Sequence, residues 1–182
     1  RRSLRVDARA CYLRGLVWDG IGRVELVPAA FLGDGSAPTN ALFRRWMVDA
    51  VTRTFRPGAS TSTGPIVFID GGGASVRFLQ ELFGGDEVLS PHELPLINGA
   101  WCACWEGAES VGVAHVIATC EPGDNVRLPV TYVGAAVVRS DRWAEGLDDL
   151  PRVRVGRWTH DVSPWRDQLW AEAVAHYGGA EP

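Results

Sequence analysis

Hydrophobic residues recur at helical spacing between positions 42 and 55, and they predict the clearest helix of the chain. Asn40 precedes this stripe and is expected to cap the helix, and Pro57-Gly58 follows it and is expected to end it. The charged residues of the segment lie largely off the stripe; they are Arg44, Arg45, Asp49 and Arg53. We expect the arginines to form a solvated face and favour this over contact with nucleic acid, which normally needs a larger basic surface.

A strand, a glycine-rich turn and a second helix are predicted next. Residues 65–69 (PIVFI) are typical of a buried strand, and the apolar positions in 76–83 predict a helix. Between them lies Asp70-Gly71-Gly72-Gly73-Ala74-Ser75, which we call the glycine turn. This layout is typical of phosphate-binding turns, in which backbone N–H groups at a helix N-terminus hold an anion.

Short apolar runs predict four later strands, at residues 101–105, 113–119, 130–138 and 152–155. Few helical patterns separate these runs, so we expect the late part of the sheet to be partly antiparallel. A last helix is expected to begin at Ser163-Pro164, a cap followed by proline. The pattern indicates an α/β fold, a sheet flanked by helices after an N-terminal helical segment.

The 182 residues suit one domain, with a helical lead-in at 1–58 and an α/β core at 64–182. Composition adds one informative absence, because all 18 basic residues are arginine. Every mechanism that needs a lysine ammonium is therefore excluded, including the P-loop lysine and a Schiff base. The net charge of −4 does not favour binding to duplex DNA, which needs a basic face.

The cysteines do not predict a metal site, because none of the four forms a C-x-x-C pair. Cys102 and Cys104 lie in an apolar run and are expected to be buried strand thiols. No apolar run approaches the length of a membrane span, and a reduced cytoplasmic setting without membrane contact is expected.

Three blocks of sequence occur in an order that resembles one family. The first runs from Tyr12-Leu13 through Trp18-Asp19-Gly20 to Arg23, and the second from Phe43-Arg44-Arg45-Trp46 to Arg56-Pro57-Gly58. The third is Arg166-Asp167-Gln168-Leu169-Trp170-Ala171-Glu172-Ala173. Together they resemble the virulence-associated E family. The resemblance implies a P-loop ATPase fold akin to superfamily-three helicases, in replication proteins of phages, plasmids and genomic islands.

The resemblance places the family's G-x-x-x-x-G-K-S/T motif on the glycine turn. The nucleotide-binding positions that it implies are Gly71, Gly72, Gly73, Ala74, Ser75 and Val76. The turn is one residue shorter than the motif, with Ser75 near the lysine position and Val76 near that of the magnesium-binding hydroxyl. A shift of one residue would return Ser75 to the hydroxyl position, but no shift supplies the lysine. We favour a plain turn over weak binding of an anion or of ATP with Mg²⁺, and competent hydrolysis is least expected.

The resemblance also implies acidic residues at Glu-x-x-Glu spacing after a strand. Glu106 and Glu109 follow the run 101–105 at that spacing, about two residues late, and are the candidate catalytic residues. A carboxylate at the end of a strand can hold Mg²⁺ or orient an attacking water. Two solvated loop glutamates are an equally favoured interpretation.

Three hypotheses for function remain open. The leading one is a catalytically silent relative that serves as a structural or regulatory module for a partner. The second is a nucleic-acid-dependent ATPase subunit of the helicase type, completed by residues of a second copy or of a replication protein. The third is a DNA-binding module that needs no nucleotide and whose binding weakens steeply with salt.

Overall fold

The computed structural model describes residues 2–70, 73–85, 88–89, 101–106, 133–139, 150–156 and 161–178. Side chains are described for all of these except residues 2–7, 89, 105 and 106. No helix within these ranges combines the length and the apolar character needed to cross a bilayer.

Five parallel strands form one sheet in the order β2-β3-β4-β1-β5. The strands are β1 (Ile66–Ile69), β2 (Val88–Leu89), β3 (Cys102–Glu106), β4 (Val133–Val138) and β5 (Arg152–Arg154). Every residue of β1 and β4 is buried, as expected for central strands of a parallel sheet. The α/β expectation is thus confirmed for the described part of the chain.

The expected antiparallel pairing of the late strands is wrong for β4 and β5, since both pair with β1 in parallel. Short apolar runs predict that a strand exists, but its direction depends on the path of the connection that precedes it. The predicted strand at 113–119 lies outside the described residues.

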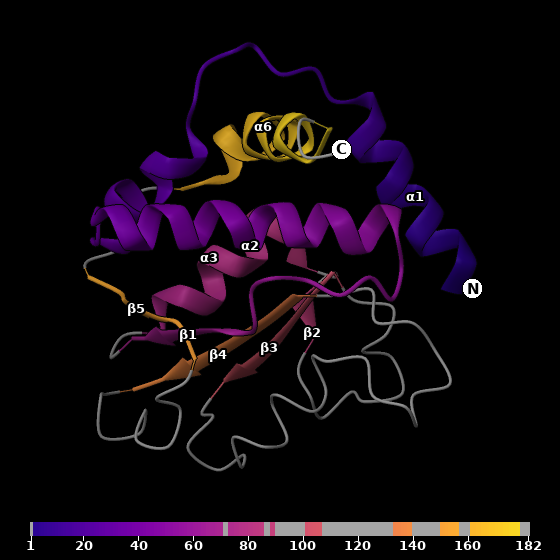
Figure 1. The fold of residues 1–182 in the computed structure, drawn as a ribbon. Helices are drawn as coiled ribbons and strands as arrows, with labels where there is room; N and C mark the ends of the chain where they lie inside the picture. Colours follow the sequence, from indigo (N-terminus) through magenta and orange to yellow (C-terminus); the bar gives the residue numbers. More distant parts are fainter. Residues whose placement is uncertain are drawn as a thin grey trace.

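The described helices lie on one side of the sheet (Figure 1). They are α1 (Arg2–Gly15), α2 (Ala37–Phe55), α3 (Ala74–Phe83) and α6 (Arg166–Gly178). A 3-10 turn at Val24–Leu26 and a π turn at Pro28–Leu32 lead into α2, and a 3-10 turn at Ser163–Trp165 leads into α6. Figure 1 shows α2 between α6 and the strands, while the chain that joins α1 to α2 passes over α6. Helix α6 therefore lies between α2 and the segment that joins α1 to α2.

Helix α2 begins earlier than its apolar stripe indicates, and Asn40 does not cap it. Ser36 is the N-cap residue, and the N–H of Asn40 donates to its carbonyl inside the first turn. Asp34 fixes this start, because its carboxylate accepts the Ser36 N–H at 3.0 Å and the Thr39 hydroxyl at 2.8 Å. The carboxylate thereby organises the turn ahead of the helix, and proline in the first turn is compatible with it.

Two charged residues of α2 that lie off its apolar stripe are buried, and one of them, Arg53, was expected to face solvent. Asp49 is 7% exposed and accepts the N–H of Thr63 at 2.8 Å, and Arg53 is 5% exposed and donates to the Thr61 hydroxyl at 2.8 Å. Burial raises the pKa of the Asp49 carboxyl, and the bond from Thr63 opposes that shift. The segment that leads into β1 covers this side of α2, so helical periodicity alone did not reveal that either residue is buried. Arg44 does face solvent and pairs with Glu25.

Large aromatic side chains join the helices to the sheet. Trp101 stacks on Trp170 of α6 with ring centroids 4.3 Å apart, and Phe83 of α3 packs edge-on against both rings. Trp46 of α2 is fully buried, and its indole N–H donates to the carbonyl of Gly134 in β4 at 3.1 Å. These rings supply much of the apolar burial that holds the helical layer on the sheet.

Candidate functional site

The ends of β1, β3 and β4 meet at one edge because the strands are parallel. Ile69 pairs with Val138, and Glu106 pairs with Val137. With neighbouring strands about 4.8 Å apart, the backbone of Glu106 lies roughly 10 Å from β1 at this edge. Glu106 is the last residue of β3 rather than the first residue of a loop, and Glu109 lies outside the described residues. Open parallel sheets bind ligands outside this edge.

The glycine turn joins this edge to α3. Gly71 and Gly72 lie outside the described residues, whereas Gly73 has a φ of 74° and is the N-cap residue of α3. That left-handed conformation favours glycine over residues that carry a Cβ. The helix begins at Ala74, two residues earlier than predicted, so Ser75 lies in its first turn, where it is fully buried. Val76 is half-buried on the same helix.

Asp70 binds both hydrogen-bond donors of Ser75 at the start of α3. Its Oδ2 atom accepts the backbone N–H of Ser75 at 2.6 Å and the Ser75 hydroxyl at 2.8 Å, and the residue is only 4% exposed. A carboxylate at a helix N-terminus satisfies free N–H groups and interacts favourably with the helix dipole. The N–H and the hydroxyl proton of Ser75, which could otherwise donate to a phosphate, are therefore engaged by a side chain of the protein itself.

Sequence reasoning treated Asp70 only as the first residue of the turn and missed this contact. A signal was present, because aspartate is among the preferred residues for capping helices and a serine follows where the first helical turn begins. The sequence alone did not show that the Asp70 side chain would reach Ser75, five positions later in the chain.

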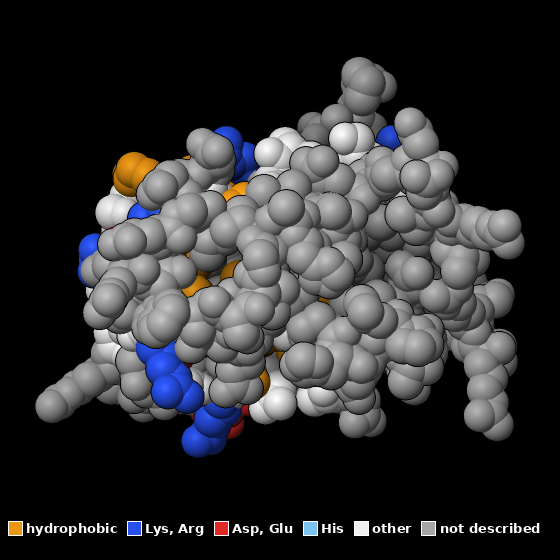
Figure 2. Space-filling model, turned by 90° about the horizontal axis from the view of Figure 1, so that it is seen from below, with side chains coloured by type: hydrophobic (Ala, Val, Ile, Leu, Met, Phe, Trp, Pro, Cys, Tyr) orange, Lys and Arg blue, Asp and Glu red, His pale blue; other side chains and the backbone are white. Residues whose placement is uncertain are grey.

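Several arginines lie near this edge of the sheet. The one that follows the glycine turn most closely in sequence, Arg77, binds a residue further along α3 instead of the turn. Arg77 donates to Glu81 at 2.7 Å along the exposed side of α3. Arg139 directly follows β4 and is exposed, and Arg154 ends β5 opposite Ile69. In the view from below, most of the visible arginine side chains lie on the left, the side at which the strands end in Figure 1 (Figure 2). The edge can therefore attract anions without a lysine.

The residues that could hold a metal ion do not cluster in the part of the chain that the structure describes. No group of three or more histidine, cysteine, aspartate or glutamate residues comes together there. Cys102 and Cys104 are buried cysteines of β3, as predicted.

The first and third blocks of the family resemblance bind each other through a surface network. Asp19 accepts two hydrogen bonds from the Arg23 guanidinium at 2.7 Å, which lowers the pKa of the Asp19 carboxyl to about 2. The N–H of Asp19 donates to the Gln168 side chain at 3.1 Å, and the amide of Gln168 donates to the carbonyl of Val17 at 3.1 Å.

Glu172 of α6 forms the buried centre of this contact. It is 3% exposed, and its Oε2 atom accepts the backbone N–H groups of Arg23 at 2.6 Å and of Val24 at 3.0 Å. We call the set Val17, Asp19, Arg23, Gln168 and Glu172 the terminal clamp. The second block is also structural, through the bonds of Trp46, Asp49 and Arg53 described above. The residues that carry the resemblance thus build the scaffold.

Comparisons with known proteins bear on the fold. No protein-family model matches the chain, and no curated protein matches it. Among solved structures, the chain is similar to one described as "The A form apo structure of NrS-1 C terminal region-CTR(305-718)", with a TM-score of 0.55 and 11% sequence identity. The match covers 94% of this chain and 47% of that one, so this chain spans about half its length. The likeness shows a shared α/β fold.

Proposed function

We propose that the chain is a P-loop-type domain of the virulence-associated E kind that serves a phage, plasmid or island replication protein as a structural or regulatory module without hydrolysing ATP. The three sequence blocks and the strand, glycine turn and helix on a parallel sheet support this proposal. The fold that the chain shares with the NrS-1 region agrees with it.

The contact between Asp70 and Ser75 carries the proposal. A phosphate at the start of α3 would have to displace a carboxylate whose charge-assisted hydrogen bonds are each worth roughly 1.5–3 kcal/mol. The displaced carboxylate would then repel the phosphate at short range. The chain also has no lysine to neutralise the charge that develops during phosphoryl transfer.

The test is a calorimetric titration with ATP, with and without Mg²⁺, together with phosphate release in the presence of single-stranded DNA. We expect no heat of binding at micromolar ATP and no turnover above the buffer background. Clear turnover that disappears in the Glu106→Gln variant would overturn the proposal.

A second candidate is a nucleotide-dependent subunit completed by residues of another copy or of a replication partner. It is favoured by Glu106, which ends β3 at the same edge as the glycine turn, and by Arg139 and Arg154, which lie beside β1 at that edge. This candidate requires assembly and binding of ATP with Mg²⁺. An ATP titration that stays flat with the partner present would count against it.

A further inference from the structure

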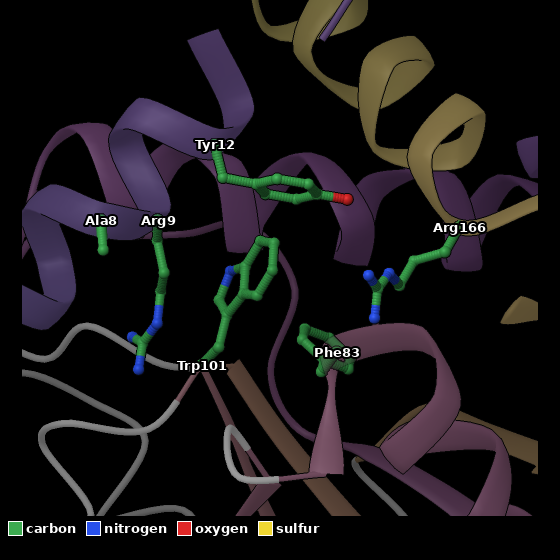
Figure 3. A pocket seen from close by; sticks show the side chains of 6 residues that line it. All are labelled: Ala8, Arg9, Tyr12, Phe83, Trp101 and Arg166. Atoms are coloured by element: carbon green, nitrogen blue, oxygen red, sulfur yellow. The ribbon is translucent and has the colours of Figure 1, made fainter. Parts of the chain in front are cut away.

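Figure 3 shows a pocket of about 230 Å³ whose walls belong to the core. Its lining consists of Ala8, Arg9, Tyr12, Phe83, Trp101 and Arg166. Phe83 and Trp101 are each 3% exposed and pack edge-on against each other, and the Tyr12 hydroxyl donates to Asp167 at 2.6 Å. Because these side chains already contact one another, this pocket leaves little surface for a ligand.

A second pocket, of about 310 Å³, lies where the segment that joins α1 to α2 meets α2 and α6, and we call it the clamp pocket. The joining segment supplies Trp18 and Leu26 to its lining, α2 supplies Arg44, and α6 supplies Glu172 and His176. Figure 1 shows the joining segment passing over α6. The volume is at the lower end of the range for ligand pockets, so the clamp pocket suits a single side chain or a small group.

One carboxylate oxygen of Glu172 is accessible from the clamp pocket. Its Oε2 atom accepts the N–H groups of Arg23 and Val24, whereas Oε1 accepts no hydrogen bond from the described residues. The described side-chain atoms that are both buried and unbonded do not include Oε1, so this oxygen is open to the pocket. It lies 3.6 Å from Nε2 of His176, and a Cβ at Gly22, another lining residue, would be 3.7 Å from it. Oε1 therefore offers an acceptor to a ligand, in surroundings where burial strengthens such a bond.

The surplus charge at the clamp pocket is negative. Asp19 pairs with Arg23 at 2.7 Å, and Glu25 pairs with Arg44 at 2.7 Å. The remaining carboxylate, that of Glu172, has only the imidazole of a histidine beside it within the described ranges, and this ring is charged only when protonated. A phosphate would be repelled here, so the ligand that fits is a cation.

Trp18 gives the pocket a flat wall against which a cation can lie. Its indole N–H donates to the Ile21 carbonyl at 3.0 Å, which fixes the half-buried ring. Cations are attracted to the faces of aromatic rings, and tryptophan is the strongest of these partners. Over the part of the chain that the structure describes, the large hydrophobic side chains that face solvent are Val17, Ile21 and Leu26, which are 80%, 58% and 53% exposed. All three belong to the joining segment, and exposed apolar side chains grouped in this way mark surfaces that bind proteins.

We propose that the clamp pocket receives an arginine side chain of a partner protein, with its guanidinium at Oε1 of Glu172 and against the ring of Trp18. A guanidinium is flat, carries several N–H donors and is more weakly hydrated than an ammonium, so it fits this wall and this oxygen better than lysine. A two-fold pair of copies would set this surface against itself, and its arginines are already paired with Asp19 and Glu25. The arginine therefore comes from another protein. The inference does not depend on the proposed lack of ATP hydrolysis, because the glycine turn takes no part in it.

The first test follows the indole signals of the eight tryptophans by ¹H–¹⁵N spectroscopy. The probes are the peptide acetyl-Leu-Arg-Leu-amide and the same peptide with citrulline, which keeps the shape of arginine without its charge. We expect the signal that is missing in the Trp18→Phe variant to shift saturably with the arginine peptide. The citrulline peptide should bind about tenfold more weakly or worse, since it lacks the charge-assisted contact. An unmoved Trp18 signal, or equal affinity for the two peptides, would overturn the proposal.

The second test measures affinity for the arginine peptide in two matched pairs of variants. Gly22→Val places carbon atoms beside Oε1 of Glu172 from an exposed position and should abolish binding. Gly15→Val is its control, because a Cβ there meets nothing within 4 Å. Arg44→Gln removes a competing cation from the pocket and should tighten binding severalfold, whereas Arg45→Gln removes an exposed arginine outside it and should bind like the parent. Equal affinity in the two glycine variants, or weaker binding by Arg44→Gln, would exclude the site.

Sedimentation of the chain without peptide separates a partner protein from a second copy. We expect the parent and Gly22→Val to have the same oligomeric state. A dimer of the parent that dissociates in Gly22→Val would assign the clamp pocket to a second copy and overturn the proposal.

Discussion

Two buried carboxylates, Glu172 in the terminal clamp and Asp70 in the glycine turn, both accept backbone N–H groups but at very different range. Glu172 binds Arg23 and Val24, which are 149 and 148 positions away. Asp70 binds Ser75, only five positions away. The first carboxylate joins the two terminal parts of the fold, whereas the second fills a place where an external anion would bind in a phosphate-binding turn.

The two carboxylates differ in what their contacts explain. The groups of the terminal clamp form hydrogen bonds with one another, so no ligand is needed to account for these contacts. The described end of the glycine turn has a left-handed glycine before α3, and both donors of Ser75 bind the protein's own carboxylate. The residues that carry the family resemblance therefore lie in the scaffold, and the contact described at the start of α3 is one within the protein.

The largest expected effect is on the clamp. Glu172→Ala leaves two N–H groups of Arg23 and Val24 without their acceptor, and we expect it to lower the free energy of unfolding by about 2–4 kcal/mol. Urea denaturation measures this. Glu25→Ala is the control, because it breaks only the exposed pair with Arg44 and should cost less than ~1 kcal/mol. Equal stability of the two variants would contradict the central place of Glu172.

Asp70→Ala should lower stability less than Glu172→Ala does, and it should allow the chain to bind pyrophosphate. Loss of this cap should lower the free energy of unfolding by about 1–2 kcal/mol. It also frees the Ser75 donors, so calorimetry should detect pyrophosphate binding that the parent lacks. Asp161→Ala is the matched control, since Asp161 accepts the N–H of Ser163 at another turn. If Asp70→Ala binds pyrophosphate no better than Asp161→Ala, the carboxylate is not what blocks the turn.

The smallest expected effect is the acid response of the clamp. The Arg23 guanidinium lowers the pKa of Asp19 from 3.8 to about 2 in the folded chain. The stabilising contribution of Asp19 is therefore complete above the unfolded value and disappears as the pH falls from about 4 through about 2. Thermal melts of the parent and Asp19→Asn should converge over that window. A difference between them that stays constant from pH 5 to pH 2 would speak against the ion pair.

The sequence predicted the elements better than their surroundings. Periodicity found β1, α3 and the last helix to within a few residues, because buried strands and amphipathic helices leave local patterns. It placed Arg53 in solvent and left Asp49 merely off the apolar stripe, because periodicity carries no information about the segment before β1 that contacts both residues. It left unnoticed the pocket lined by Tyr12, Phe83, Trp101 and Arg166, because these residues come from three helices and from the position before β3.

The sequence by itself determined that this chain has no lysine ammonium to grip a triphosphate, and that a glycine turn separates a buried strand from a helix. These are properties of residue type and of neighbours along the chain. Only the tertiary structure decided that the late strands run parallel, that Glu172 receives the N–H groups of the N-terminal segment, and that the Asp70 carboxylate folds over onto Ser75. The physical reason is that hydrogen-bond partners and burial are set by distance in space, which the order of residues does not record.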